Sequence, residues 1–170
     1  MTEVSRLLAS PVARVALSLE EIQAVALEPV VAHKVRQAYA QLQRPVLVED
    51  TGLTFTAWNG LPGALIKWFL TSLRTDGLCR LLQNDNDRRA TATTVFGYYD
   101  GTVYQSFTGS VEGWIPEHPR GTQGFGWDPI FQPVGSALTF AEMTPEEKDR
   151  FSMRRRALAQ LRTSGLLDQR

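Results

Sequence analysis

Two adjacent carboxylates are the sequence feature with the clearest chemical potential. Glu49 and Asp50 directly follow the apolar run at residues 46–48, which is typical of a strand covered on both faces. Carboxylates at the end of a buried strand repel each other and are poorly solvated, so they need a nearby cation or a raised pKa. Mg²⁺ binds one or two carboxylates together with substrate phosphates. The pair indicates such a site, with a solvated corner between strand and turn as the alternative.

An aromatic loop is the second candidate. Phe125, Trp127 and Asp128 lie within a Gly- and Pro-rich stretch, residues 116–133, whose composition is typical of an active-site loop. Two aromatic rings beside an aspartate can stack on a flat base and hydrogen-bond to its edge. The alternative is an aromatic plug that closes the core, a common role for Phe and Trp. A further acidic pair, Glu20-Glu21, on its own favours a surface loop.

A basic segment near the C-terminus is the third candidate. Ser152 can cap a helix predicted over residues 152–161, and the N-terminus of a helix attracts anions. Successive helical residues are rotated by about 100° around the axis. The three arginines at 154–156 therefore cannot all face one site, and one or two of them could reach a ligand.

The elements that must position these residues alternate between helix and strand. Apolar spacings of three and four predict helices, which cover residues 3–9, about 29–42, about 61–73, a short stretch after Asp76-Gly77 and 152–161. Strands are predicted at 12–17 and 46–48, and as a hairpin of 90–99 with 102–114 around the type I′ dipeptide Asp100-Gly101. This order predicts an α/β fold with a mixed sheet and one domain over residues 1–170.

Composition narrows the class of protein. The chain has 170 residues and 18 basic against 18 acidic side chains, and balanced charge argues against binding to duplex nucleic acid. No apolar run approaches the roughly 20 residues that span a bilayer, so we expect no membrane partner. The one cysteine, Cys79, fits a reducing cytosol. We expect a soluble cytoplasmic protein, in which local charge can still bind a small anionic ligand.

Five ordered motifs resemble the inosine triphosphate pyrophosphatase family, the enzymes that remove deaminated purine nucleotides. The motifs are PVLVEDTGL at 45–53, LPGALIKWFL at 61–70, GFGWDPIF at 124–131, TFAEMTPEEK at 139–148 and SMRRRAL at 152–158. The resemblance covers residues 3 to about 162. It implies an elongated mixed sheet with flanking helices, two lobes around a central cleft, and a homodimer. It also implies Mg²⁺-dependent hydrolysis of ITP, dITP or XTP to the monophosphate and pyrophosphate.

The resemblance also implies roles for individual residues. Asp50 matches the catalytic aspartate, and the metal would be held by Glu21, Glu49 and Asp50. The positions that match substrate contacts are Lys34 for phosphate, Phe125, Trp127 and Asp128 for the base loop, and Lys148, Ser152 and Arg154 for further contacts to the nucleobase. A purine with a carbonyl at position 6 accepts a hydrogen bond where adenine donates one, so donors such as Lys148 and Arg154 favour the deaminated base.

Two departures from the family pattern leave an alternative open. The family opens with a strand and a Thr-Gly-Asn-x-x-Lys phosphate loop, whereas Met1 here corresponds to the helix after that lysine, and a start site assigned too late is one hypothesis. Met153 stands where the family has histidine, and methionine cannot donate a hydrogen bond to a base. The alternative is a degenerate family member that binds nucleotides or a partner without efficient turnover.

Overall fold

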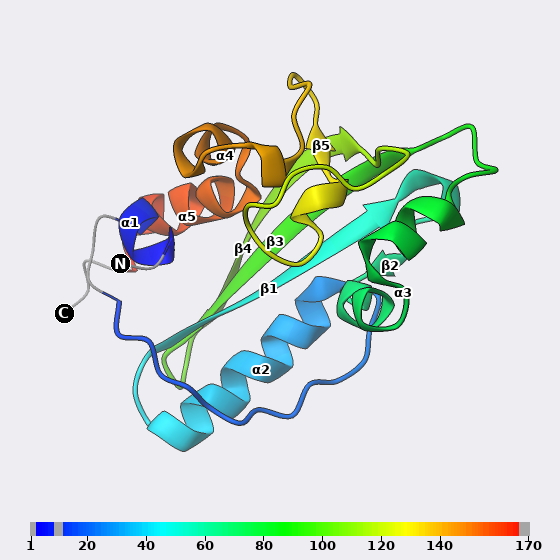
Figure 1. The fold of residues 1–170 in the computed structure, drawn as a ribbon. Coiled ribbons are helices and arrows are strands. Elements are labelled where there is room, and N and C mark those ends of the chain that lie inside the picture. The colour runs from blue at the N-terminus through cyan, green and yellow to red at the C-terminus, as the bar shows by residue number, and fades with distance from the viewer. Residues whose placement is uncertain (1–2, 9–11, 167–170) are drawn as a thin grey trace.

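The fold is built on one antiparallel sheet of five strands. The computed structural model describes residues 3–8 and 12–166. The strand order is β2-β1-β3-β4-β5, and Figure 1 shows the three long strands β1, β3 and β4 side by side. The strands are β1 Val46–Phe55, β2 Pro62–Gly63, β3 Arg89–Tyr99, β4 Tyr104–Trp114 and β5 Gln132–Pro133.

The α/β class is confirmed, but the prediction of a mixed sheet is wrong for the described residues. All four strand pairings there are antiparallel. Helices between strands suggest parallel crossovers, yet the chain between β1 and β3 returns to the end at which β1 finishes, so that Phe55 pairs with Ala90. The β3–β4 hairpin is confirmed. Its loop is residues 100–103, where Gly101 has a φ of 101° and Asp100 accepts two backbone N–H bonds, so it is no two-residue type I′ turn.

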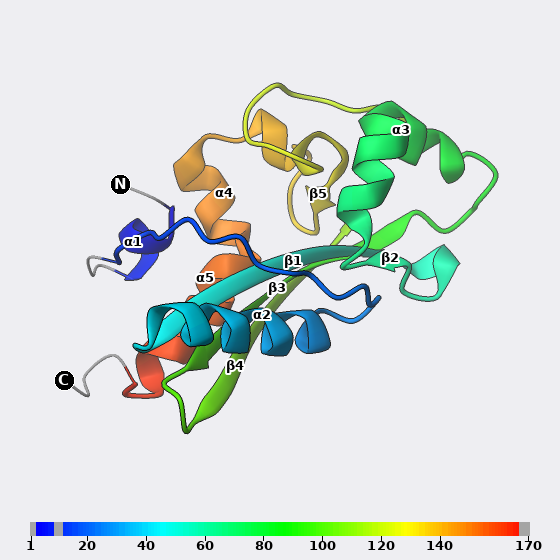
Figure 2. The same cartoon turned by 90° about the horizontal axis from the view of Figure 1, so that it is seen from below.

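Two long helices cover opposite faces of the sheet, as the two views in Figures 1 and 2 agree. They are α2 Leu27–Leu42 and α5 Met153–Thr163. On β3, Val95 packs with Val31 of α2, whereas the next residue, Phe96, packs with Leu158 of α5. This division follows from the two-residue period of a strand, in which successive side chains point to opposite faces.

Three further α-helices are described: α1 Glu3–Leu8, α3 Ile66–Leu81 and α4 Pro145–Phe151. Short 3₁₀ helices lie at Thr56–Trp58, Asp128–Ile130 and Phe140–Glu142. The predicted helix at 3–9 is confirmed to residue 8, and residue 9 lies outside the described residues. Arg74 has a non-helical backbone (φ 58°, ψ 179°) and divides α3 in two, as the two predicted helices anticipate. The prediction missed α4, although Thr144 and Glu147 form its capping box. No described helix is long and apolar enough to cross a membrane.

Near the acidic residues, the predicted strand at 12–17 is wrong and the predicted strand at 46–48 is too short. Residues 12–17 join no sheet in the described structure, and Val12 and Val15 are each 40% exposed. Their β-branched side chains favour an extended backbone, but a strand also needs a neighbouring strand to pair with. By contrast, β1 continues past Val48 through Glu49 and Asp50 to Phe55, because β3 offers a partner along this whole length. The carboxylates therefore lie inside a strand and not at its end.

Candidate active site

The placement of Glu49 and Asp50 inside β1 sends their side chains to opposite faces of the sheet. Glu49 accepts a hydrogen bond from Arg154 of α5, with 2.5 Å between Oε1 and Nε. Asp50 accepts one from Lys34 of α2, with 3.3 Å between Oδ1 and Nζ. A nearby cation, one of the two possibilities that the sequence suggested, is thus found on each face: Arg154 on one and Lys34 on the other. Each carboxylate has its own positively charged partner.

Lys34 is the meeting point of the acidic groups on the α2 face. Its ammonium lies 2.8 Å from Oε1 of Glu21 and 3.3 Å from Oδ1 of Asp50. It also donates to the backbone oxygen of Glu49 at 3.4 Å. Two carboxylates from separate segments, the 20–25 loop and β1, therefore converge on one cation position.

The electrostatics of this cluster follow from its partial burial. Burial raises the pKa of Asp50 above its ordinary value, and the attraction of Lys34 offsets only part of that effect. The hydrogen bond from Lys34 lowers the pKa of Glu21, against a smaller opposing effect of burial. Burial opposes the charge of Lys34, but Glu21 and Asp50 together outweigh it and raise the lysine pKa. The pKa values of the two carboxylates are therefore shifted in opposite directions, that of Asp50 upward and that of Glu21 downward.

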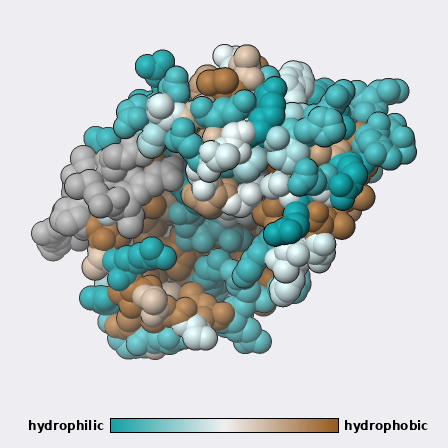
Figure 3. Space-filling model, in the orientation of Figure 1, coloured by the Kyte–Doolittle hydropathy of each residue, from teal (hydrophilic) through white to brown (hydrophobic). Residues whose placement is uncertain are grey.

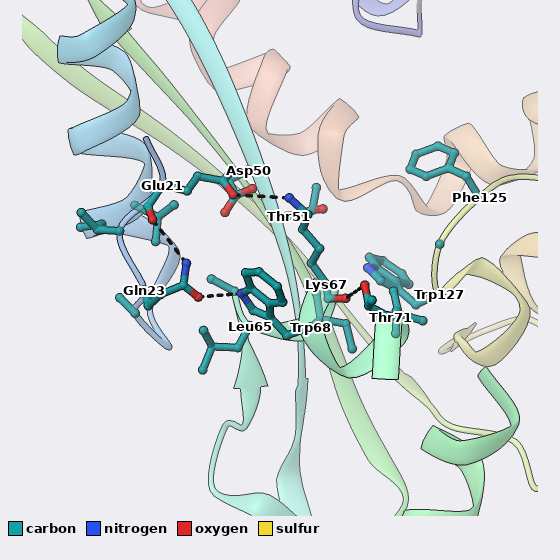
Figure 4. Close-up of a pocket in the computed structure, with 17 residues that line it drawn as sticks. Glu21, Gln23, Asp50, Thr51, Leu65, Lys67, Trp68, Thr71, Phe125 and Trp127 are labelled. Carbon is teal, nitrogen blue, oxygen red and sulfur yellow. Dashed lines mark hydrogen bonds and ion pairs between the residues drawn. The ribbon is translucent and has the colours of Figure 1, made fainter. Parts of the chain in front are cut away.

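A cavity of about 320 Å³ opens beside Asp50. Figure 4 shows Glu21 and Asp50 at one side of it, with Lys67, Trp68 and Thr71 of α3 across from them. Lys67 lies 3.7 Å from Glu21 between Nζ and Oε2. A second cavity of about 780 Å³ is lined by Leu47, Val48 and Glu49 of β1, by Arg154 and by residues 12–15. In Figure 3 the surface is hollowed above α2, with hydrophilic residues inside the hollow.

Phe125 borders both cavities. Its ring is 61% exposed, with the ammonium of Lys148 at 5.2 Å and the guanidinium of Arg154 at 5.3 Å from the ring centre. Its backbone N–H donates to Oδ2 of Asp128 at 2.8 Å, and that oxygen also accepts from Lys148 at 2.7 Å. A flat ring over two cations is a suitable surface for stacking a nucleobase.

Trp127 and Asp128 are buried, unlike Phe125. The indole of Trp127 packs edge-to-face on Phe131, with 5.7 Å between ring centres, and close to Phe140. Trp127 thus matches the alternative of a plug that closes the core, while it still lines the smaller cavity. Asp128 holds the loop by accepting from Phe125 and Lys148, so its position is that of a loop anchor.

The start of α5 agrees with the sequence analysis. Ser152 is buried and caps the helix by accepting from the N–H of Arg155 at 3.3 Å. Of the three arginines, Arg154 turns inward to Glu49, whereas Arg155 and Arg156 are exposed. Met153 is 3% exposed and belongs to the hydrophobic core, so its side chain packs rather than facing solvent.

The predicted metal ligands converge only in part. Within residues 3–8 and 12–166, no three acidic, histidine or cysteine side chains form a group that could hold a metal ion. Glu21 and Asp50 do share one cation, Lys34, and their oxygens are the hard ligands that Mg²⁺ prefers. The residues therefore fit a divalent cation held by two carboxylates together with substrate phosphates. The side chain of Glu49 lies on the other face of β1.

Four further residues line the smaller cavity, although no motif in the sequence predicted a role for them: Gln23, Lys67, Trp68 and Thr71. Three of them fall within the quoted motif LPGALIKWFL or directly after it. The available signal was the polar spacing Lys67 to Thr71, which is one helical turn and places both side chains on one face of α3.

Comparisons with known proteins show which family the chain belongs to. The Ham1 family model matches residues 1–164, and the chain belongs to this family. An inosine triphosphate pyrophosphatase 2 from Trypanosoma cruzi is 45% identical over 153 residues, which are 89% of this chain and 78% of that protein. A dITP/XTP pyrophosphatase from Hyperthermus butylicus is 44% identical over 146 residues, 86% of this chain and 77% of that protein.

The fold is shared with solved structures as well. A HAM1 protein from Coxiella burnetii superimposes with a TM-score of 0.81 at 28% sequence identity, covering 95% of this chain and 90% of that chain. The α/β arrangement of sheet and helices is therefore that of the Ham1 family.

Proposed function

We propose that the chain hydrolyses ITP, dITP and XTP to the monophosphate and pyrophosphate in a Mg²⁺-dependent reaction, and so cleans the nucleotide pool. The observation that carries the proposal is the convergence of Glu21 and Asp50 on one cation position beside a cavity. The names of the relatives, inosine triphosphate pyrophosphatase and dITP/XTP pyrophosphatase, support the same substrates.

Asp50 is the proposed general base. Water attacks the α-phosphorus, its proton passes to the carboxylate of Asp50, and the bond from the α-phosphorus to the bridging oxygen breaks as pyrophosphate leaves. Burial raises the pKa of Asp50, which brings a carboxylate closer to the pKa that suits proton abstraction near neutral pH. Lys34, in contact with Asp50, supplies positive charge close to the reacting phosphate.

Glu21 and Asp50 would hold the divalent cation, which when bound screens the charge of the phosphates. Glu21 suits this role because the hydrogen bond from Lys34 lowers its pKa and keeps it ionised. Lys67, 3.7 Å from Glu21, extends the positive charge along the cavity wall toward α3. Together these side chains give a path of alternating charge for a triphosphate chain.

The base would stack on the exposed ring of Phe125, with Lys148 and Arg154 at its edge. Both cations donate hydrogen bonds and cannot accept them. They match the carbonyl at position 6 of hypoxanthine or xanthine and leave the amino group of adenine without an acceptor. A site of this kind discriminates by about 10⁴-fold or more.

Pyrophosphate release from ITP, XTP, GTP and ATP with Mg²⁺ tests the proposal. We expect release from ITP and XTP, and loss of release in Asp50→Asn. Nucleotide binding without release would favour the alternative of a degenerate binding protein, which Met153 in place of histidine keeps open. The resemblance also supports a cytoplasmic homodimer, and light scattering coupled to gel filtration tests the dimer.

A further inference from the structure

The position of Glu21 needs an explanation, because this residue lies in a segment with neither helix nor strand. Residues 12–24 have no regular secondary structure, and Glu21, Ile22 and Gln23 are all exposed. A carboxylate that must share a cation with Asp50 needs a defined position. The strand and helix that fix Asp50 and Lys34 do not extend to Glu21, so side-chain contacts must hold it.

The amide of Gln23 makes two hydrogen bonds that link Glu21 to α3. Its Oε1 accepts from the indole Nε1 of Trp68 at 2.6 Å, and its Nε2 donates to the backbone oxygen of Glu21 at 3.3 Å. Figure 4 shows this chain of contacts from α3 through Gln23 to the backbone beside Glu21. One side chain thus connects a rigid helix to the segment that carries the carboxylate.

The backbone next to Gln23 closely approaches β2 and the residue that follows it, just before α3 begins. Gly63 has a φ of 61°, and a Cβ there would lie 2.2 Å from the backbone oxygen of Val25. The N–H of Ala64 donates to the same oxygen at 2.9 Å. These contacts bring the end of the segment to the start of α3, where Trp68 can reach Gln23.

Trp68 leaves about half of its large side chain exposed. It is 54% exposed, although tryptophan is strongly buried on average. Its indole N–H instead donates the short bond to Gln23 at the edge of the cavity beside Asp50.

We propose that Gln23 and Trp68 are positioning residues that hold Glu21 for the divalent cation. The inference rests on the proposed role of Glu21 as a ligand of the divalent cation, and metal binding can be measured separately from turnover. Contacts that orient a metal ligand typically change metal affinity by about 10- to 100-fold when they are removed.

The test measures the affinity of the protein for Mn²⁺ in the absence of nucleotide. Electron paramagnetic resonance of the free ion reports how much Mn²⁺ remains unbound. Gln23→Leu removes both amide contacts, and Trp68→Phe removes only the indole donor. We expect each substitution to weaken Mn²⁺ binding by about tenfold. The double variant should be no weaker than the weaker single variant, because both substitutions break the same connection.

Matched controls separate positioning from general stability. Gln41→Leu removes a bond from another glutamine to the backbone of the same segment, at Ser18, and Trp114→Phe alters another exposed tryptophan. Both controls should leave Mn²⁺ binding within about twofold of the wild type. Gln23→Glu keeps an acceptor for Trp68 but cannot donate to Glu21 while it is ionised. Thermal melting of every variant identifies any that are unfolded.

Unchanged Mn²⁺ affinity in folded Gln23→Leu and Trp68→Phe overturns the inference, and so does a wild type that binds no Mn²⁺. Additive losses in the double variant also overturn it, because they would mean two independent contacts. Hydrolysis of ITP by the wild type is scored separately. If the wild type hydrolyses ITP and the variants bind Mn²⁺ as tightly as it does, the proposed function stands and the positioning role falls. If the wild type does not hydrolyse ITP but the variants bind Mn²⁺ more weakly than it does, only the positioning role stands.

Discussion

Glu49 and Asp50 are neighbours in sequence, yet they face opposite sides of β1 and pair with cations from different helices. Arg154 of α5 holds Glu49 at 2.5 Å, and Lys34 of α2 holds Asp50 at 3.3 Å. The alternation of side chains along a strand thus separates two adjacent charges. It places one carboxylate on the side of the exposed ring of Phe125 and the other beside Glu21. The two halves of the site should therefore respond separately to substitution.

The Glu49 side should serve the nucleobase. Arg154→Met removes a charged donor near Phe125, and we expect the KM for ITP to rise about tenfold, in line with the loss of a charge-assisted hydrogen bond. Mn²⁺ affinity should stay within about twofold, because Arg154 contacts the face opposite Asp50. Steady-state kinetics and metal titration measure the two effects. If Arg154→Met weakened Mn²⁺ binding by the same factor as it raised the KM for ITP, the two faces of β1 would not act separately.

The Asp50 side should serve the cation. Lys34→Met removes the ammonium that Glu21 and Asp50 share, and a positive charge at that position competes with a metal ion. We expect Mn²⁺ to bind at least about tenfold more tightly without nucleotide. Turnover of ITP should fall about 10²- to 10³-fold, because charge stabilisation near the phosphate is lost. Weaker Mn²⁺ binding in this variant would contradict the claim that the metal ion and the ammonium of Lys34 compete for the same carboxylates.

Gly109 sets the distance between β4 and α5. A Cβ there would lie 2.0 Å from the backbone oxygen of Met153 and 2.7 Å from the backbone nitrogen of Ala157. Gly109→Ala must therefore push α5 outward, and we expect a loss of about 1–3 kcal/mol in the free energy of unfolding. Urea denaturation measures it, with Gln105→Ala, an exposed position on the same strand, as the control. Equal midpoints for Gly109→Ala and wild type would show that α5 adapts without cost.

Cys79 should make the fold sensitive to alkali. Burial raises the pKa of its thiol from 9.0 to about 11. A folded-state pKa above the unfolded value gives stability that is fully present below about pH 9 and is lost as the pH rises through about 11. We expect the urea midpoint of the wild type to fall more steeply from pH 9 to 11 than that of Cys79→Ala. Parallel curves for the two proteins would contradict this.

Local signals predicted the elements that local chemistry determines. The cap of Ser152 on α5 and the hairpin around Gly101 depend on residues close in sequence, and both were predicted. The extent of β1 could not be predicted in the same way, because it depends on pairing with β3 from Val46–Tyr99 to Phe55–Ala90. That pairing extends the predicted strand at 46–48 to Phe55.

The candidate site shows the same division. Residue type indicated the acidic pair and the aromatic loop, but it could not say that Phe125 would be exposed while Trp127 packs on Phe131. The contact of Gln23 with Trp68 joins residues 45 positions apart. Neither residue carries a charge that would mark it in the sequence.

The most direct test of the central claim is pyrophosphate release from ITP with Mg²⁺, compared between the wild type and Asp50→Asn. The substitution keeps the size of the side chain and removes the proton acceptor beside Lys34. The account predicts release from ITP and XTP by the wild type, far slower release from ATP, and no measurable release by Asp50→Asn with nucleotide binding retained. Release by Asp50→Asn at the wild-type rate would contradict it.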